Sequence, residues 1–162
     1  MRRSGRLRNM ASLYLLQGNR ILLLYRQGNS IVKDMWVGSA GGHFEPFELN
    51  DPMACVLREL KEELDLTEDA IENLQLRYAT MRDMDGQIRQ NYYFFADLKN
   101  GFCEKLSSTE GILQWFSLNE LQGLKMPFTA RYVIDHYFAT GRFDAKLYGG
   151  IGNDRGVIFI EM

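Results

Sequence analysis

The sequence predicts a single domain of the mixed α/β (α+β) class, spanning residues 1–162. Its 162 residues, 46% of them hydrophobic, are enough for one well-buried core and too few for two. Short runs rich in Leu, Ile and Tyr are bounded by turn residues, as strands are. Between them lies a segment with apolar residues at three- and four-residue spacing, which is typical of a helix. Strands interleaved with helices therefore define the fold class.

The first predicted element is a β-hairpin. Residues 11–17 and 21–27 are apolar runs separated by Gly18-Asn19, a pair that favours a tight turn between antiparallel strands. Arg26 ends the second run, where we expect the mouth of a site, although most arginines are ordinary surface residues.

The helix expected over residues 52–64 has a well-marked start. Asp51 can accept a hydrogen bond from the first free backbone N–H groups, and Pro52 fits the first helical position. One stripe is apolar and must face a core; it contains Met53, Val56, Leu57, Leu60 and Leu64.

A second face of this helix carries three carboxylates, those of Glu59, Glu62 and Glu63. Like charges at this spacing destabilise a helix by roughly 0.2–0.5 kcal/mol per pair. Such a face is either a solvated surface or a binding site for a hard cation such as Mg²⁺ or Mn²⁺.

After a short helical turn at residues 67–69, the chain is expected to form a second hairpin. Residues 77–83 and 87–98 have strand character around the turn Met84-Asp85-Gly86. The second strand contains a dense aromatic run, in which alternation points one set inward and one outward. Core packing explains most of the run, but Tyr92 or Phe94 could stack on a base.

The last part of the chain combines two helices with two strands. Ser117 and Glu120 fit a capping box, and Thr129 is expected to cap a helix that runs to Thr140 and closes at Gly141. His136 shares that helix's packing face, so we expect it to be a packed residue. Strands are expected over residues 142–148 and 156–162.

Composition limits the classes of function. A net charge of −2 gives no electrostatic case for duplex nucleic acid. Cys55 and Cys103 lack metal-ligand spacing, and two unpatterned cysteines fit a reducing cytoplasm. No stretch approaches the ~18 apolar residues of a membrane span. Residues 1–9 are basic, and we expect a flexible leader, with phosphate or RNA binding as the alternative.

The stretch 41–66 resembles the Nudix box, G-x5-E-x7-R-E-U-x-E-E-x-G-U, where U is aliphatic. The matching positions are Gly42, Glu48, Arg58, Glu59, Leu60, Glu62, Glu63 and Leu66. Nine residues rather than seven separate Glu48 from Arg58, Phe47 stands where glycine is common, and Asp65 replaces a glycine near the end. Aspartate tolerates the left-handed conformation of a helix stop better than most residues.

The resemblance implies a Nudix α/β/α sandwich, with a mixed sheet between helices, that hydrolyses diphosphate linkages with Mg²⁺ or Mn²⁺. It implies metal ligation by the Gly41 carbonyl and by Glu59, Glu62 and Glu63. Glu110, shortly before Trp115, resembles the downstream ligand of MutT-type members, with Glu104 as the alternative. His43 is less suited, because imidazole prefers softer metals.

The resemblance also implies roles around the metal. Glu59 is our candidate for the general base, with Glu110 as the alternative. Arg58 is expected to orient the glutamates, and Gly42 and Glu48 to shape the loop before the helix. Candidate substrate contacts are Arg26, Trp36, Tyr92, Phe94 and Thr129.

The expected partner is a small nucleotide, bound by a monomer or homodimer. Our first choice is a nucleoside triphosphate, in particular an oxidised purine such as 8-oxo-dGTP. ADP-ribose, nucleotide sugars, dinucleoside polyphosphates and capped RNA remain alternatives, as does a non-catalytic ligand-binding module. An isopentenyl diphosphate isomerase is disfavoured, because Gly41 stands where that enzyme needs a cysteine.

Overall fold

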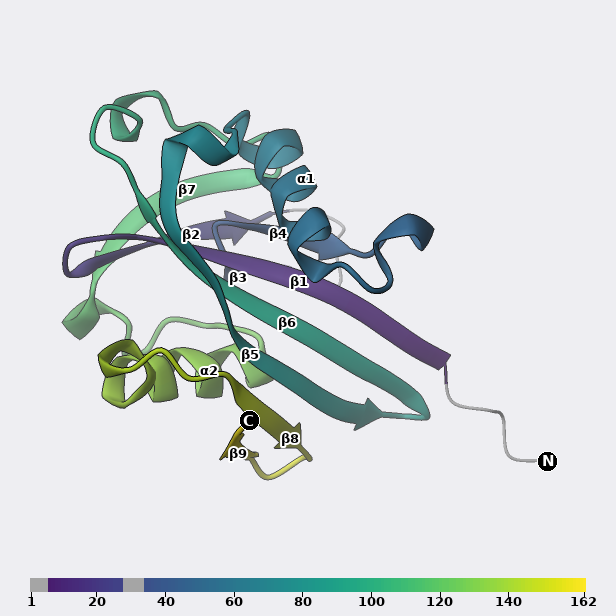
Figure 1. The fold of residues 1–162 in the computed structure, drawn as a ribbon. Helices are drawn as coiled ribbons and strands as arrows, with labels where there is room; N and C mark the ends of the chain where they lie inside the picture. Colours follow the sequence, from purple (N-terminus) through teal and green to yellow (C-terminus); the bar gives the residue numbers. More distant parts are fainter. Residues whose placement is uncertain (1–5, 28–33) are drawn as a thin grey trace.

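The computed structural model describes residues 6–27 and 34–162, which form one nine-stranded mixed sheet between two helices. Figure 1 shows α1 against one face and α2 against the other, which confirms the predicted sandwich. The strand order is β3-β2-β1-β6-β5-β8-β9, with β4 paired to β1 and β7 paired to β2. The strands are β1 (Arg6–Gln17), β2 (Arg20–Arg26), β3 (Met35–Val37), β4 (Ala40–His43), β5 (Ile71–Met84), β6 (Gln87–Leu98), β7 (Gly111–Ser117), β8 (Tyr148–Gly152) and β9 (Val157–Glu161).

Both predicted hairpins are present. Gln17 pairs with Arg20 across Gly18-Asn19, and Met84 pairs with Gln87 across Asp85-Gly86. Both residues of the second turn have positive φ, 54° and 81°, which is the geometry of a two-residue hairpin turn. The parallel pairs β1·β6 and β5·β8 make the sheet mixed.

Helix α1 (Pro52–Leu64) has the predicted bounds. The backbone N–H of Ala54 donates to Asp51 Oδ1 at 3.0 Å, and Asp65 ends the helix at φ 52°, in the left-handed region. The apolar stripe packs Val56, Leu60 and Leu64 against the sheet. The substitution of aspartate for glycine at the helix stop is therefore structurally mild.

Helix α2 (Phe128–Ala139) covers the opposite face. Its cap is Pro127, so the prediction that Thr129 caps the helix is wrong; Thr129 lies in the first turn. The proline already fixes the backbone for helix entry. His136 Nδ1 lies 2.7 Å from the Tyr78 hydroxyl, which confirms it as a packed residue.

Two further expectations differ from the structure. Strand β1 begins at Arg6, so residues 6–9 are strand rather than leader, because their backbone pairs in parallel with β6; residues 1–5, with Arg2 and Arg3, lie outside the described residues. Residues 36–43 are divided between β3 and β4, because the Ser39 hydroxyl interrupts the ladder by accepting from Leu15 N and donating to Leu22 O.

The strand expected over residues 142–148 is mostly a turn. Asp144 accepts hydrogen bonds from Arg77, from the backbone N–H of Lys146 and from the Tyr148 hydroxyl. These bonds hold the chain bent until β8 begins at Tyr148. The final strand is confirmed as β9, at the edge of the sheet.

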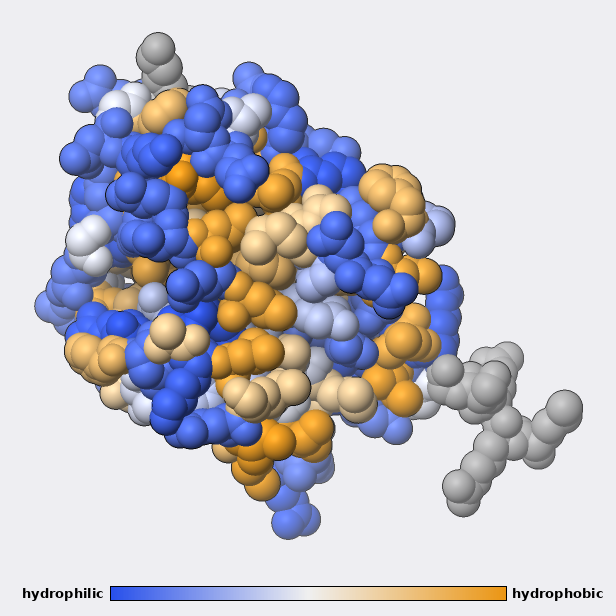
Figure 2. All heavy atoms as spheres, viewed as in Figure 1, coloured by the Kyte–Doolittle hydropathy of each residue, from blue (hydrophilic) through white to orange (hydrophobic). Residues whose placement is uncertain are grey.

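The edge at β9 is apolar on its outer side. Ile158 and Ile160 are 74% and 58% exposed, and hydrophobic atoms gather at the tip of β8 and β9 (Figure 2). An exposed apolar edge strand is the part of a sheet most prone to pair with other chains. Within the described residues, no helix is both long and apolar enough to cross a membrane.

Candidate active site

Two carboxylates of α1 are buried beside strand β4. Glu59 and Glu63 are each 8% exposed. Glu63 Oε2 accepts from the backbone N–H of Gly41 at 3.2 Å, and Glu63 Oε1 lies 3.5 Å from Arg26 Nη2. Burial raises the pKa of Glu63 to about 7 and also raises the pKa of Glu59. When these two groups ionise, the surrounding protein therefore does not fully compensate their negative charge.

Arg58 binds the remaining carboxylates of the helix and loop. Its Nε and Nη2 donate to the two oxygens of Glu48 at 2.6 and 3.1 Å. Its Nη1 donates to Glu59 Oε1 at 2.8 Å and to Glu62 Oε2 at 2.9 Å. Glu48 is fully buried, and these bonds from Arg58 hold its pKa below the usual range. Arg58 thus fixes the orientation of two carboxylates on its own helix through an anchor in the loop.

A short turn before Glu48 sets the direction of its side chain, and the two extra residues follow this turn, between Glu48 and Arg58. The 3₁₀ helix η1 (Pro46–Glu48) is closed by a hydrogen bond from the Glu45 N–H to Glu48 Oε2 at 2.9 Å. That turn aims Glu48 inward at Arg58. The longer loop therefore leaves the contact between Glu48 and the helix intact.

Both glycines at the start of the box are sterically required. Gly41 has φ +154°, and a Cβ there would lie 2.4 Å from Ala11 O and 2.9 Å from Ser12 Cα. A Cβ on Gly42 would lie 2.3 Å from Glu59 Oε1. Glycine at these positions lets β4 approach β1 on one side and the Glu59 carboxylate on the other.

The donor set suits a hard divalent cation. All of its donor atoms are oxygens. Two of the carboxylates, those of Glu59 and Glu63, are desolvated, and their raised pKa values show that a positive partner would stabilise their ionised form. Among residues 6–27 and 34–162, no three acidic, histidine or cysteine side chains converge on one point. The reason is local, because Arg58 engages Glu59 and Glu62.

The two candidate outside ligands lie in different places. Glu110 directly precedes Gly111, which pairs with Arg26, and its negative charge contributes to the raised pKa of Glu63. Glu104 lies in η3 (Cys103–Lys105), next to Cys103, whose Sγ accepts a hydrogen bond from Gln17 at the C-terminal end of β1. Gly41 pairs with Ser12, which lies earlier in the same strand. The structure brings Glu110, and not Glu104, towards the carboxylate helix.

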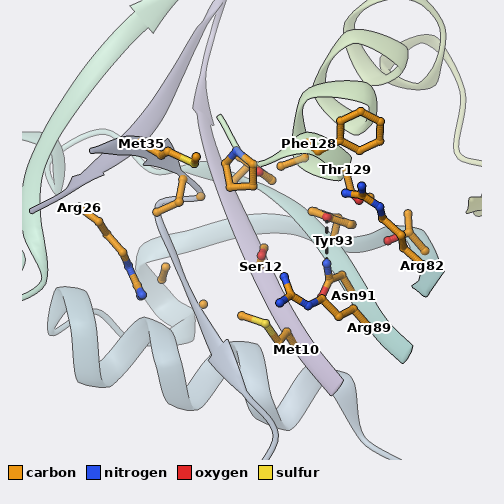
Figure 3. Close-up of a pocket in the computed structure, with 18 of the residues that line it drawn as sticks. Met10, Ser12, Arg26, Met35, Arg82, Arg89, Asn91, Tyr93, Phe128 and Thr129 are labelled. Carbon is orange, nitrogen blue, oxygen red and sulfur yellow. Dashed lines mark hydrogen bonds between the residues drawn. The ribbon is translucent and has the colours of Figure 1, made fainter. Parts of the chain in front are cut away.

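A cavity of about 370 Å³ opens beside these groups. Figure 3 shows that its floor is the face of the sheet formed by β1, β5 and β6, and that the start of α2 forms one wall. Gly41, Glu63 and Arg26 line one part of it. Apolar and polar side chains alternate over the rest, which include Met10, Ser12, Met35, Thr80, Arg82, Arg89, Asn91, Tyr93, Phe128 and Thr129.

The structure places two of the five predicted substrate contacts in this cavity, Arg26 and Thr129. Trp36 instead packs edge-on against Phe116 at 4.7 Å, and its neighbour Met35 lines the cavity. Trp36 packs against the buried cluster that includes Phe116 and Tyr14, so core packing sets its position.

The alternation of side chains along a strand explains why Tyr92 and Phe94 do not line the cavity. Phe94 is 1% exposed in the core beneath α1, and Tyr92 stacks on Phe44 on that face. Asn91 and Tyr93 face the cavity instead. Because both faces of this sheet are covered, an unbroken aromatic run does not reveal which of the two alternating sets of side chains faces the site.

Sequence reasoning also missed Arg82 and Arg89, which line the cavity. A signal was present, because the two-residue Asp85-Gly86 turn pairs Arg82 with Arg89. Two arginines facing each other across a hairpin are unfavourable unless something anionic lies nearby.

Buried carboxylates on a helix, held by an arginine and set beside a partly cationic cavity, are suited to hydrolysis of phosphoanhydride bonds. The comparison with family models gives the same class, because residues 6–137 match the NUDIX domain. The chain belongs to the Nudix family and is a pyrophosphohydrolase.

Solved structures share the fold. A MutT protein from Bacillus halodurans is 20% identical, with a TM-score of 0.69 over 95% of this chain and 97% of the other. An Ap4A hydrolase from C. elegans is 19% identical, with a TM-score of 0.66 over 85% and 99%. The ORF135 protein of E. coli is 22% identical, with a TM-score of 0.64 over 84% and 91%. No curated protein sequence matches the chain.

Proposed function

We propose that this protein hydrolyses a nucleoside triphosphate to the monophosphate and pyrophosphate, with Mg²⁺ or Mn²⁺ as cofactor. The observation that carries the proposal is Glu63. Its buried carboxylate lines the cavity, lies 3.5 Å from Arg26 and has a pKa raised to about 7. A desolvated carboxylate beside a substrate-sized cavity is suited to holding a cation against an anionic ligand.

A bound divalent cation would supply positive charge to the diphosphate and make a nearby water more acidic. Glu59, Glu62, Glu63 and the Gly41 carbonyl would hold it, with Glu110 as an additional carboxylate. Arg58 has a positioning role, since it already donates to Glu48, Glu59 and Glu62. Arg26, at the cavity wall, would contact the phosphates.

Glu59 is our proposed general base, with Glu110 as the alternative. Burial raises the pKa of Glu59, and a carboxylate with a raised pKa accepts a proton more effectively near neutral pH. Arg58 restrains one of its oxygens at 2.8 Å. The other oxygen remains available for the attacking water.

An oxidised purine such as 8-oxo-dGTP is the proposed base, and Asn91 supports it. Asn91 Oδ1 is buried on the cavity wall without a hydrogen-bond donor in the described structure, while its Nδ2 donates to Tyr93 at 3.3 Å. Ordinary guanine presents N7 as an acceptor. Oxidation at C8 puts a hydrogen on N7, which would satisfy this oxygen.

The test is a substrate panel with purified protein and Mg²⁺, followed by release of pyrophosphate and phosphate. The panel holds 8-oxo-dGTP, dGTP, other triphosphates, ADP-ribose, a nucleotide sugar, a dinucleoside polyphosphate and capped RNA. Preferred turnover of 8-oxo-dGTP with pyrophosphate release supports the proposal. Turnover restricted to the last four substrates refutes the triphosphate assignment, and no turnover of any diphosphate favours a ligand-binding module.

Variants separate the metal site from the base site. Glu62→Gln and Glu63→Gln should each remove most activity, whereas Glu72→Gln, on an exposed position of β5, should not. Asn91→Leu should lower the preference for 8-oxo-dGTP over dGTP by at least about 10-fold. Gln90→Leu is its matched control, because the next residue along the strand faces away from the cavity.

We also propose a single functional domain over residues 1–162, acting in the cytoplasm. Cys55 and Cys103 are both unpaired, as expected for a reducing compartment. Whether the chain is a monomer or homodimer can be measured by sedimentation.

A further inference from the structure

Three arginines form a row that crosses the floor of the cavity and continues into an adjoining hollow. In the sheet register, Arg8 of β1 pairs with Arg89 of β6, and Arg89 pairs with Arg82 of β5. Residues directly opposite each other on neighbouring strands share a face of the sheet. Arg82 and Arg89 line the cavity, and Arg8 continues the row at its edge, in an adjoining hollow. We call Arg8, Arg89 and Arg82 the arginine row.

No carboxylate neutralises the arginine row. Within the described residues, none of the three has an acidic group within 4.0 Å of its guanidinium. The two ranges outside the description, 1–5 and 28–33, contain no Asp or Glu. Like charges that lie directly opposite each other on neighbouring strands repel and destabilise the sheet. The row is therefore an uncompensated concentration of positive charge.

The contacts that the row does make leave polar groups unsatisfied. Arg82 Nε is buried and has no hydrogen-bond partner in the described structure, and the Arg82 guanidinium lies 4.2 Å from the centre of the Phe128 ring. Arg89 Nε donates only to the amide oxygen of Gln87, at 3.1 Å. A solvated surface row would not bury an unpaired donor. A missing anionic ligand accounts for both the charge and the unpaired nitrogen.

The row lies at a distance from the carboxylate helix. Arg8 precedes Ser12 by four residues in β1, and Ser12 pairs with Gly41; four strand residues span about 13 Å. Figure 3 shows Arg26 on one side of β1 and Arg82 and Arg89 on the other. Along β1 this backbone separation exceeds the length of a diphosphate held near Glu63 and Arg26. An anion on another part of the same substrate can reach it.

We propose that the arginine row binds a second phosphate of the substrate, carried by the nucleoside portion away from the scissile diphosphate. The favoured substrate class is thus a nucleotide that carries, beyond the 5′-phosphates of a simple triphosphate such as 8-oxo-dGTP, a further phosphate either on its own ribose or in the linkage to a following nucleotide. This inference rests on the proposed hydrolysis of a nucleoside diphosphate linkage. Guanidinium groups suit the role, because each can donate two parallel hydrogen bonds to phosphate.

Binding of reaction products tests the row independently of turnover. Isothermal titration calorimetry would compare nucleoside 5′-monophosphates with the matching 3′,5′-bisphosphates, and a third arm would use 5′-phosphorylated dinucleotides. The expected result is binding at least about 10-fold tighter for one of the doubly phosphorylated probes. The arm that shows the gain identifies the position of the second phosphate. Equal affinity for all three classes overturns the proposal.

Variants assign the gain to the row. Arg82→Gln and Arg89→Gln should bring the affinity ratio close to one, and Arg89→Lys should restore part of it. Arg142→Gln is the control, because Arg142 is exposed and contacts Asn19 at the far end of β1. Circular dichroism and an unchanged affinity for the 5′-monophosphate would show that each variant is folded. A ratio that persists in both Gln variants would also overturn the proposal.

Hydrolysis assays complete the design. If wild-type protein shows the binding preference and turns over no diphosphate, the proposed function fails and the phosphate site stands. If it hydrolyses triphosphates with no binding preference for a second phosphate, the function stands and the assignment of the row fails.

Discussion

Replacing Glu63 by glutamine should stabilise the metal-free protein at alkaline pH while removing its activity. The carboxylate is buried on α1, and its pKa is raised to about 7 even though Arg26 and the Gly41 N–H partly favour the charged form. In an unfolded chain a glutamate has a pKa of about 4.3. The folded state therefore holds a proton on Glu63 over a pH range in which the unfolded state has released it.

The sign and size of the effect follow from this difference. Between about pH 4.5 and 7 the unfolded chain binds fewer protons than the folded one, so the free energy of unfolding falls as pH rises. A difference of about 2.7 pKa units corresponds to roughly 3.5 kcal/mol at pH 8, and to about 1 kcal/mol at pH 5. Glutamine carries no charge and can still accept the Gly41 N–H, so Glu63→Gln should recover most of that free energy.

The assay is urea unfolding in the presence of EDTA at pH 5 and pH 8. We expect wild type and variant to differ by less than about 1 kcal/mol at pH 5, and the variant to be more stable by roughly 3 kcal/mol at pH 8. Adding Mg²⁺ should stabilise wild type more than the variant. A variant that is less stable than wild type at pH 8 would show that Arg26 and Gly41 compensate the carboxylate, and the reasoning from desolvation would be wrong.

Three further perturbations test other parts of the site and fold. Gly41→Ala should destabilise by more than about 2 kcal/mol in urea, because its Cβ would meet Ala11 O at 2.4 Å; Gly18→Ala, with positive φ but open space, should lose about 1 kcal/mol, and equal losses would refute the steric argument. Glu48→Gln should cost roughly 3 kcal/mol at pH 7, since it removes the buried carboxylate that Arg58 binds at 2.6 Å; an unchanged midpoint would show that this pair contributes little. Burial lowers the pKa of His136, so as pH drops below about 6.5 the unfolded chain takes up a proton first and the free energy of unfolding should fall. His136→Gln should flatten the dependence of this free energy on pH between pH 7 and 5. An unchanged dependence would show that another group causes it.

The elements that could be predicted from sequence are those specified by local chemistry. The bounds of α1 follow from Asp51, Pro52 and Asp65, which act within one turn of the helix. The hairpins follow from Gly18-Asn19 and Asp85-Gly86. The carboxylate cluster is equally local, because helical spacing alone puts Glu59, Glu62 and Glu63 near one another.

The elements that were predicted wrongly depend on contacts distant in sequence. Residues 6–9 become strand because β6, some eighty positions later, supplies a parallel partner. The bend at Asp144 exists because Arg77 reaches it from β5 at 2.9 Å. Neither β6 nor Arg77 can be identified as a partner from sequence spacing. Parallel strands are not joined by a short turn that would fix their register.

The contrast between the two sides of the site has the same origin. The proposed cation-binding groups lie on a helix, where one turn determines which side chains share a face. The floor of the cavity is formed by strands, and which of their side chains face it depends on what the rest of the chain covers. Tyr92 and Tyr93 are interchangeable by composition, and only the positions of α1 and α2 decide that Tyr93 lines the cavity. The arginine row is an exception, because the Asp85-Gly86 turn fixes the register that opposes Arg82 and Arg89. Two like charges that a hairpin turn places opposite each other, with no countercharge, therefore indicate a ligand site. This signal can be recognised in the sequence without knowing which face of the strand meets the site.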